Sequence, residues 1–225
     1  MTSLNLRALR SSLLGLAFMA GLLFIPAGTL RYWQAWAFIA VFSASSTAIT
    51  VYLARNNPAL LERRIKAGPQ AEAEAAQKVI MSFAMSSFLA MLVVPALDRR
   101  FGWTEVPALA SVAGDALVAI SFLLVFFVLR ANSYSASTIQ VVEGQQAVST
   151  GPYALVRHPM YAGVLPMLLG IPLALGSWWG LATLAVFVPA LVWRLLDEER
   201  FLLRKLPGYV EYCQRVRYRL LPGIW

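Results

Sequence analysis

The sequence predicts an all-α integral membrane protein of about five to six transmembrane helices, and its composition is the first reason. Of its 225 residues, 59% are hydrophobic and only 13% are charged. An ordinary soluble domain is about 45–50% apolar. The charged residues are also clustered, so long stretches of the chain have no ionisable side chain. In water such surface would aggregate, whereas a bilayer requires it.

Six apolar runs are the second reason for this fold class. About 20 helical residues cross a hydrocarbon core of ~30 Å. The second, fourth and sixth runs fit that length. The first and fifth are short, and the fifth contains two prolines, so we expect it to be kinked or to cross incompletely, forming a helical hairpin with the sixth. The runs are Ser11–Ala27, Trp33–Leu53, Val79–Leu97, Val112–Leu129, Pro159–Leu175 and Ser177–Leu196.

The distribution of basic residues is the third reason, and it predicts the orientation. Lys and Arg accumulate in cytoplasmic segments of membrane proteins. With the N-terminus inside and six crossings, only Arg31, Arg99 and Arg100 of the 19 Lys and Arg residues fall outside. Both termini are therefore expected in the cytoplasm. We interpret the first run as a transmembrane helix rather than a cleaved leader, because no convincing small-residue cleavage site follows it.

Charge and residue counts exclude several functions. The net charge of +8 would suit nucleic-acid binding, but in this apolar background cytoplasmic Lys and Arg explain it better. One cysteine, Cys213, cannot form an intramolecular disulfide. With one histidine the chain lacks a zinc-type ligand set, so no metal site is predicted.

Two polar stretches organise the chain. The sequence from Arg55 to Lys78 contains Leu-Leu-Glu-Arg-Arg and an Ala/Glu/Gln-rich segment, which predicts an amphipathic cytoplasmic connector at about 55–78. Beyond Arg130, Ser137–Val142 and Gln146–Thr150 flank a Glu-Gly pair, which predicts a short β-hairpin. We divide the chain at this point. Residues 1–130 hold four helices and the connector, and residues 131–225 hold the hairpin loop, the helical hairpin and the tail that carry the chemistry.

The densest functional signal is Gly-Pro-Tyr-Ala-Leu-Val-Arg-His-Pro-Met-Tyr-Ala-Gly at residues 151–163. Pro159 fits the first position of a helix, where its missing N–H costs nothing. His158 then lies at or near the N-cap, beside free N–H groups that attract anions. Together with Arg157 it would form an anion site at the membrane edge. The same pair could instead anchor the helix to lipid headgroups, and this segment alone does not decide between the two.

Two further segments lie on the same predicted side of the membrane. Asp197, Glu198 and Glu199 end the last helix, where the simpler interpretation is a solvated helix end. Tyr209 and Tyr212 share one face of a tail helix, which by itself indicates an amphipathic helix on the bilayer. Taken together, the three segments would combine an anion site, carboxylates and aromatic rings. Such a site suits a ligand that carries both charges, including a sulfonium cation.

These motifs resemble the isoprenylcysteine carboxyl methyltransferase family, which is related to phospholipid methyltransferases. The pattern is Gly-Pro-Tyr-x3-Arg-His-Pro-x-Tyr-x-Gly, then Glu-Glu, then Gly-Tyr-x2-Tyr-x2-Arg-Val. Arg31-Tyr32-Trp33-x2-Trp36 and Asn57-Pro58-x-Leu60-Leu61-Glu62-Arg63 look like the bacterial branch, which implies a bacterial inner membrane. The likeness is most specific over residues 137–216. After Val216 the sequence departs from the family, where a proline usually follows sooner.

The resemblance implies S-adenosylmethionine as methyl donor, bound between the last two helices and the tail. It gives Arg157, His158 and Arg215 roles in anchoring the cofactor or an acidic acceptor. The polar run after the fourth helix suggests that Asn132 and Tyr134 border the acceptor. The expected cofactor-binding residues are Gln140, Tyr153, Arg157, His158, Pro159, Tyr161, Gly163, Glu198, Glu199, Tyr209 and Tyr212.

The expected function is methyl transfer to a lipophilic or lipidated acceptor, with an isoprenylcysteine-type carboxylate favoured. Displacement at a sulfonium methyl requires alignment more than acid–base help when the acceptor is a carboxylate or thiolate. Amine and thiol acceptors stay open, as does the oligomeric state. The alternatives are a membrane reductase of the sterol-reductase type that uses NADPH, and a non-catalytic membrane scaffold or lipid-binding protein.

Overall fold

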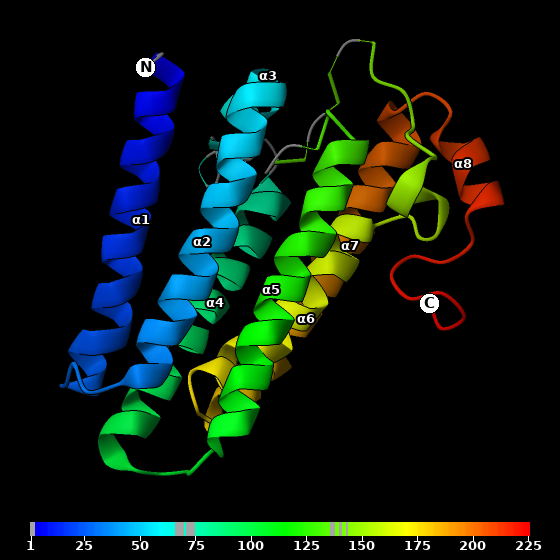
Figure 1. Ribbon diagram of the computed structural model, residues 1–225. Coiled ribbons are helices and arrows are strands. Elements are labelled where there is room, and N and C mark those ends of the chain that lie inside the picture. The colour runs from blue at the N-terminus through cyan, green and yellow to red at the C-terminus, as the bar shows by residue number, and fades with distance from the viewer. Residues whose placement is uncertain (1–2, 66–69, 71–74, 136–137, 140, 143) are drawn as a thin grey trace.

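The computed structural model describes residues 3–65, 70, 75–135, 138–139, 141–142 and 144–225. Within this part of the chain the protein is a bundle of helices and contains no strand (Figure 1). Five helical stretches are long and apolar enough to cross a membrane. The prediction of an all-α integral membrane protein is confirmed. The five stretches are Leu4–Ala27, Trp33–Asn56, Ala75–Phe101, Ala108–Ala131 and Trp179–Lys205.

The helices agree with the apolar runs but continue beyond them into polar sequence. The last helix, for example, ends at Lys205, nine residues beyond the predicted end of its apolar run at Leu196. It continues because nothing in its sequence stops a helix before Pro207. The α-helices are α1 Ser3–Ala27, α2 Trp33–Asn56, α3 Pro58–Ile65, α4 Ala75–Phe101, α5 Ala108–Ala131, α6 Pro159–Ala174, α7 Leu184–Lys205 and α8 Tyr209–Arg215. Two short 3₁₀ helices are η2 Gly151–Ala154 and η3 Trp179–Thr183.

Helix α6 is the short member of the bundle, as expected from its run. Its 16 residues span only about 24 Å, less than the hydrocarbon core. His158 is its N-cap residue and Pro159 its first helical residue, as predicted. In Figure 1 α6 begins well below the end of α5, and helix α8 lies above its start. The start of α6 is therefore recessed below the end of α5, and we call this end of the bundle, which the basic residues predict to face the cytoplasm, the inner rim.

Helices α5 and α6 cross where Gly114 and Gly170 bring the two backbones into close contact. A Cβ atom added at Gly114 would lie 2.2 Å from the backbone nitrogen of Ala174, and one at Gly170 would lie 2.7 Å from the Gly114 carbonyl oxygen. The Ser121 hydroxyl donates a 2.6 Å hydrogen bond to the Gly163 carbonyl farther along the same crossing. Small residues of this kind let membrane helices pack backbone to backbone. The crossing fixes the position of α6.

The opposite end of the bundle is closed by hydrogen bonds to Asp98, a buried residue near the end of α4. Its carboxylate accepts from the Thr104 backbone N–H at 2.8 Å and from the Ser177 hydroxyl at 2.5 Å. The Ser177 oxygen accepts in turn from the Gly180 N–H. These bonds hold the turn between α6 and η3 against α4.

The connector between α2 and α4 is partly described. Within it, α3 is amphipathic, since Leu60 and Leu61 are buried with residues of α1, α2 and α5. Its basic face reaches the segment after α5: Arg63 donates to the Ser133 carbonyl at 2.6 Å and Arg64 to the Ser135 carbonyl at 3.4 Å. The amphipathic character is as predicted, and α3 is thereby tied to the loop that covers the inner rim.

The predicted β-hairpin of residues 137–150 is wrong where it can be assessed. A turn is present, because the Gln145 N–H donates to the Val142 carbonyl at 3.1 Å and Gly144 has a φ of +76°. The described residues on either side of it form no strand. Val141 and Ala147 instead pack against the tyrosines of α8. Contacts with α8 therefore take the place of strand pairing.

Candidate active site

A cavity of about 540 Å³ lies under the inner rim, between α4, α6 and α7. The segment after α5 and helix α8 contribute to its inner wall. Its polar end includes Arg157, His158 and Glu198, whereas Met81, Met85 and Phe88 of α4 line its apolar end. The cavity thus joins a polar compartment at the inner rim to an apolar one at membrane depth, which is the form expected of a small-molecule site.

A buried carboxylate organises the polar end. The Glu199 side chain is only 6% exposed and accepts hydrogen bonds from Arg157 at 2.8 Å and from Arg219 at 2.7 Å. His158 Nε2 lies 3.9 Å from the same carboxylate, which is too far for a hydrogen bond. Two arginines compensate the buried negative charge, as such a charge requires. Glu199 therefore joins α7, the start of α6 and the tail.

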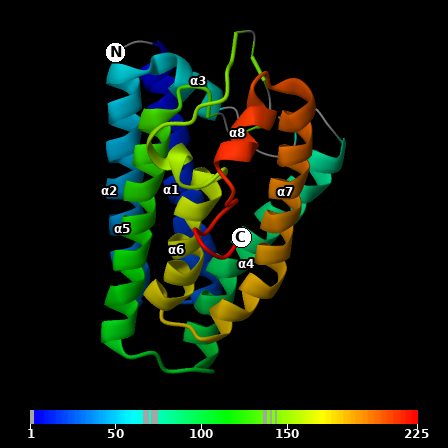
Figure 2. The same ribbon diagram turned by 90° about the vertical axis from the view of Figure 1, so that its right-hand side faces the viewer.

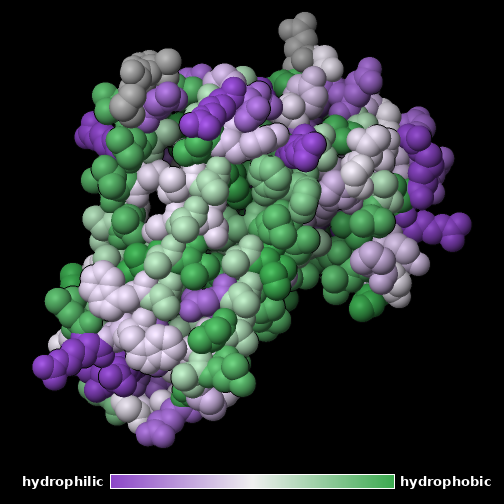
Figure 3. Space-filling view, in the orientation of Figure 1, coloured by the Kyte–Doolittle hydropathy of each residue, from purple (hydrophilic) through white to green (hydrophobic). Residues whose placement is uncertain are grey.

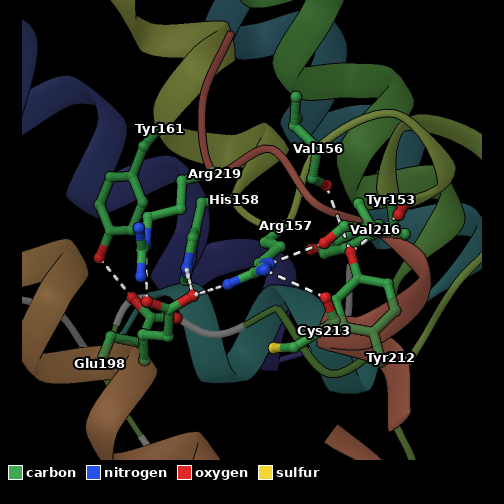
Figure 4. Close-up of polar contacts among 11 residues, drawn as sticks. Tyr153, Val156, Arg157, His158, Tyr161, Glu198, Tyr212, Cys213, Val216 and Arg219 are labelled. Carbon is green, nitrogen blue, oxygen red and sulfur yellow. Dashed lines mark hydrogen bonds and ion pairs between the residues drawn. The ribbon is translucent and has the colours of Figure 1, made fainter. Parts of the chain in front are cut away.

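Each of the three guanidinium nitrogens of Arg157 donates a hydrogen bond within the protein. It donates to Glu199, to the Val216 carbonyl at 2.7 Å and to the Cys213 carbonyl at 3.0 Å (Figure 4). Burial acts to lower the pKa of Arg157, but the hydrogen bond to Glu199 and the surrounding negative charge outweigh it and raise this pKa above its ordinary value. The fixed charge of Arg157 thus holds the tail against the end of α7.

The chain beyond α8 covers the start of α6. The backbone N–H of Arg157 donates to the Tyr218 carbonyl at 2.8 Å, and that of His158 donates to the Arg219 carbonyl at 3.0 Å. Figure 2 shows this segment running down between α6 and α7. The backbone N–H groups of Arg157 and His158, which precede the first turn of α6, are thus taken by the tail.

Glu198 faces the cavity from the next position of α7. The Tyr161 hydroxyl donates to its carboxylate at 2.5 Å, and both residues line the cavity. The buried Arg194 lies one turn earlier on the same helix, and its guanidinium donates to Gln77 Oε1 at 3.0 Å. Gln77 also donates to Asp197, so α4 and α7 are connected at the cavity wall. The two adjacent glutamates therefore have different surroundings: Glu199 is enclosed by arginines and Glu198 faces open space.

Two buried polar atoms beside the cavity have no hydrogen-bond partner among the described residues. They are His158 Nε2 and the Tyr209 hydroxyl oxygen. Burial, followed by the nearby Cys213, raises the pKa of Tyr209 well above its ordinary value, so this hydroxyl keeps its proton. An unpaired buried polar atom costs free energy, and a partner is therefore expected. A polar ligand in the cavity would supply one.

Tyr212 and Tyr153 anchor the wall formed by α8 and η2. The buried Tyr212 hydroxyl donates to the Tyr153 carbonyl at 2.8 Å and to the Val156 carbonyl at 3.2 Å. The Tyr153 hydroxyl accepts from the Asn132 amide at 3.0 Å, and burial raises the pKa of Tyr153. Tyr209 and Tyr212 have ring centroids 5.6 Å apart. The end of α5, η2 and α8 thus form one hydrogen-bonded wall.

Most of the residues predicted for the site lie together, with three exceptions among those described. Gly163 lies away from the cavity, because its backbone packs on α5 and a Cβ there would lie 3.3 Å from Leu124 Cβ. Glu199 lies behind the wall, and Arg215 is exposed and does not line the cavity. Gln140 lies outside the described residues. Those that line the cavity are Asn132, Tyr134, Tyr153, Arg157, His158, Pro159, Tyr161, Glu198, Tyr209 and Tyr212.

Sequence reasoning missed Arg219, Arg194 and the contribution of α4. Arg219 follows the last recognisable motif, and its contact with Glu199 depends on the path of an irregular segment. Arg194 precedes the acidic triplet on the same helix and belongs to no motif of its own. A signal for α4 was present, since Met81, Met85 and Phe88 recur at helical spacing on one face.

Comparison with known proteins finds a family match over residues 109–207. Residues 109–207 match the family model of phospholipid methyltransferases. This stretch, somewhat less than half of the chain, begins in α5 and ends after α7, so it includes the Arg-His-Pro segment and both glutamates. The phospholipid methyltransferases are a membrane methyltransferase family, related to the isoprenylcysteine methyltransferases that the motifs resemble. Their match supports a membrane methyltransferase, and methyltransferases of this type generally use S-adenosylmethionine.

The chain is also similar to a sterol reductase. It is 34% identical over 91 residues to the Delta(14)-sterol reductase TM7SF2 of Mus musculus. The aligned part is 39% of this chain and only 22% of the reductase, so the chain spans about a fifth of the length of that relative.

Proposed function

We propose that this protein is an integral membrane methyltransferase that transfers a methyl group from S-adenosylmethionine to a lipophilic acceptor, with an isoprenylcysteine-type carboxylate favoured. One observation carries the proposal. A single cavity joins a polar end, bearing Glu198 and the unpaired atoms of His158 and Tyr209, to an apolar end lined by α4. The match to phospholipid methyltransferases over α5 to α7 supports it.

The residues at the polar end fit the donor by charge. Glu198 would accept hydrogen bonds from the ammonium group or the ribose hydroxyls of S-adenosylmethionine. His158 Nε2 and the Tyr209 hydroxyl would gain the hydrogen-bond partners that they lack. The buried ring of Tyr209 also offers a face to the sulfonium cation. When bound, S-adenosylmethionine supplies an electrophilic methyl group. Arg157 and Glu199 then act as positioning residues, because their bonds hold the tail and α8 in place.

The acceptor would approach from the apolar end. Its head would lie beside Tyr161 and Arg194, and its apolar part along Met81, Met85 and Phe88. A carboxylate or thiolate acceptor needs little proton transfer, so the main contribution of the protein is to align acceptor oxygen or sulfur, methyl carbon and donor sulfur. Orientation of this kind contributes roughly 7–11 kcal/mol to lowering a barrier.

A reductase that binds NADPH is the second candidate, because the chain resembles part of a sterol reductase. The match to phospholipid methyltransferases over residues 109–207 favours the methyltransferase. The carboxylate of Glu198 suits the cationic groups of S-adenosylmethionine, and the three arginines that also line the cavity, Arg64, Arg157 and Arg194, suit its carboxylate. A scaffold or lipid-binding role predicts tight binding of neither cofactor.

Titration calorimetry with S-adenosylhomocysteine and with NADPH separates these functions. We expect the detergent-purified protein to bind S-adenosylhomocysteine and not NADPH. Glu198→Gln should weaken that binding about tenfold, because it removes a charge-assisted hydrogen bond. Glu211→Gln, which removes a carboxylate from the exposed face of α8, is the matched control and should bind like the wild type.

Binding of NADPH alone would overturn the proposal in favour of a reductase, and binding of neither ligand would favour the scaffold. The acceptor is found separately, by incubating the protein with methyl-labelled S-adenosylmethionine and membrane extract. Label that enters an organic-soluble product and is released by base as methanol identifies a carboxyl acceptor. Base-stable label points to nitrogen or sulfur.

A further inference from the structure

A second hollow, outside the candidate active site, lies between α1, α2 and α4. It has a volume of about 490 Å³. Its walls are α1 from Leu9 to Leu22, α2 from Phe42 to Thr47, and Phe88 and Leu92 of α4. We call it the α1–α2 groove. In Figure 3 the surface is hollowed between these two helices, within the apolar band of the molecule.

The groove exists because both helices present small residues to it. Ser12 and Gly15 lie on the α1 side, and Ser43 and Ser46 on the α2 side. A Cβ atom added at Gly15 would meet no other atom within 4 Å, so the space beside it is open. The Ser46 hydroxyl donates to the Ser43 carbonyl at 3.2 Å, which satisfies it within its own helix. The groove is therefore apolar in character although several of its residues are serines.

One face of α4 connects the groove to the candidate active site. Met81, Met85, Phe88 and Leu92 follow one another at spacings of three and four residues, which places them on one stripe of the helix. Met81 and Met85 line the active-site cavity, Leu92 lines the groove, and Phe88 lines both. The stripe from Met81 to Leu92 is about 16 Å long. The Phe88 side chain thus stands at the boundary between the two spaces.

We propose that the α1–α2 groove binds the hydrocarbon chain of the methyl acceptor, whose head lies in the active-site cavity and whose chain passes Phe88. This inference rests on the proposed function and extends it to a long-chain substrate. The groove has the features such a chain requires: it is apolar, lies among membrane-spanning helices and is elongated, since Leu9 and Leu22 are about 20 Å apart along α1.

A photoreactive acceptor analogue tests the inference. The probe is N-acetyl-S-farnesylcysteine with a diazirine at the end of its chain, added to the full-length protein in lipid nanodiscs with S-adenosylhomocysteine present. We expect adducts on α1 and α2 within the groove, and we expect unlabelled N-acetyl-S-farnesylcysteine to suppress them. Gly15→Leu should lower their yield about tenfold, because its side chain fills the open space beside Gly15 and would overpack the groove around a bound chain.

Gly21→Leu is the matched control. It adds the same side chain to the same helix at a position that does not line the groove, where an added Cβ would be in ordinary contact, 3.7 Å from Ile25. We expect wild-type labelling of the groove in this variant. Both variants should bind S-adenosylhomocysteine like the wild type, which shows that they are folded.

Kinetics with a series of chain lengths provides a second measurement. With geranyl, farnesyl and geranylgeranyl forms of N-acetylcysteine as acceptors, Gly15→Leu should raise KM for the longer chains and leave the geranyl form unchanged. Adducts confined to α4, α6 and α7, or groove adducts that unlabelled analogue does not suppress, would overturn the inference. Suppressible groove adducts in a protein that binds no S-adenosylhomocysteine would contradict the proposed function instead, and would leave the groove as a chain-binding site.

Discussion

At the scale of single residues, the two adjacent glutamates of this site have different surroundings. Glu199 is enclosed by Arg157 and Arg219, and Glu198 faces the cavity with Tyr161. The separation follows from helix geometry, since adjacent side chains point about 100° apart. That the two glutamates differ could be predicted from the sequence, but which of them faces the cavity could not, because the choice depends on how α7 is rotated against α6 and the tail.

The tail arginine that contacts Glu199 is not the one to which the motif pointed. The motif resemblance pointed to Arg215, whereas Arg219 contacts Glu199. No local pattern marks Arg219. Its position follows from backbone hydrogen bonds that residues 218–219 form with Arg157 and His158, about 60 residues earlier in the chain. Pairing of this kind between distant, irregular segments has no periodic signature in a sequence.

We predict that Arg219→Ala destabilises the protein and that Arg215→Ala does not. Loss of Arg219 leaves Glu199 buried with one arginine fewer, which should cost about 1–3 kcal/mol. The measurement is the thermal unfolding midpoint in detergent, followed by tryptophan fluorescence. Arg215 is exposed, so its replacement is a matched removal of charge. Equal midpoints for the two variants would contradict the role given to Arg219.

At the scale of elements, the helix hairpin of α6 and α7 positions the chemistry, and α5 positions the hairpin. The sequence predicted the hairpin from its apolar runs, and it predicted the N-cap of α6 from His158 and Pro159. It did not predict that α6 would lie against α5. That contact depends on Gly114 and Gly170 meeting across the two helices, and a single glycine in an apolar run does not reveal its partner.

We predict that Gly114→Ala separates these helices. The added Cβ would lie 2.2 Å from the Ala174 backbone, which no side-chain rotation can relieve. The expected loss of stability is about 3 kcal/mol, at the upper end for overpacking. Thermal unfolding in detergent measures it, with Gly15→Ala as the control, since that position has open space and alanine is the better helix former. A Gly114→Ala variant as stable as this control would show that α5 and α6 can move apart freely.

At the scale of the whole molecule, helices α3 and α8 lie at one end of the bundle (Figure 1). The polar end of the cavity is at this end, and the hydrogen bonds of Asp98 close the other. The basic residues predict that the cavity end faces the cytoplasm. This arrangement could be anticipated from the sequence because hydropathy and charge act on whole segments. The connection between the cavity and the α1–α2 groove could not, because it depends on side-chain packing among three helices.

We predict that the segment between α1 and α2 lies outside and that the tail lies inside. In a Cys213→Ala background, Leu30→Cys and Arg217→Cys place single reporters at two exposed positions. A membrane-impermeant maleimide should modify the first in intact cells and the second only after permeabilisation. Modification of both in intact cells would reverse the assigned position of the tail and remove the cytoplasmic site.

The contact of residues 218–219 with the start of α6 has a consequence for how the protein is made. Every α-helix of the described residues precedes Arg219, so the contact of Glu199 with its second arginine and those of the Arg157 and His158 amides with their acceptors require a segment made after these helices. A chain that stops before Tyr218 would contain all of these helices and would still leave the start of α6 uncovered.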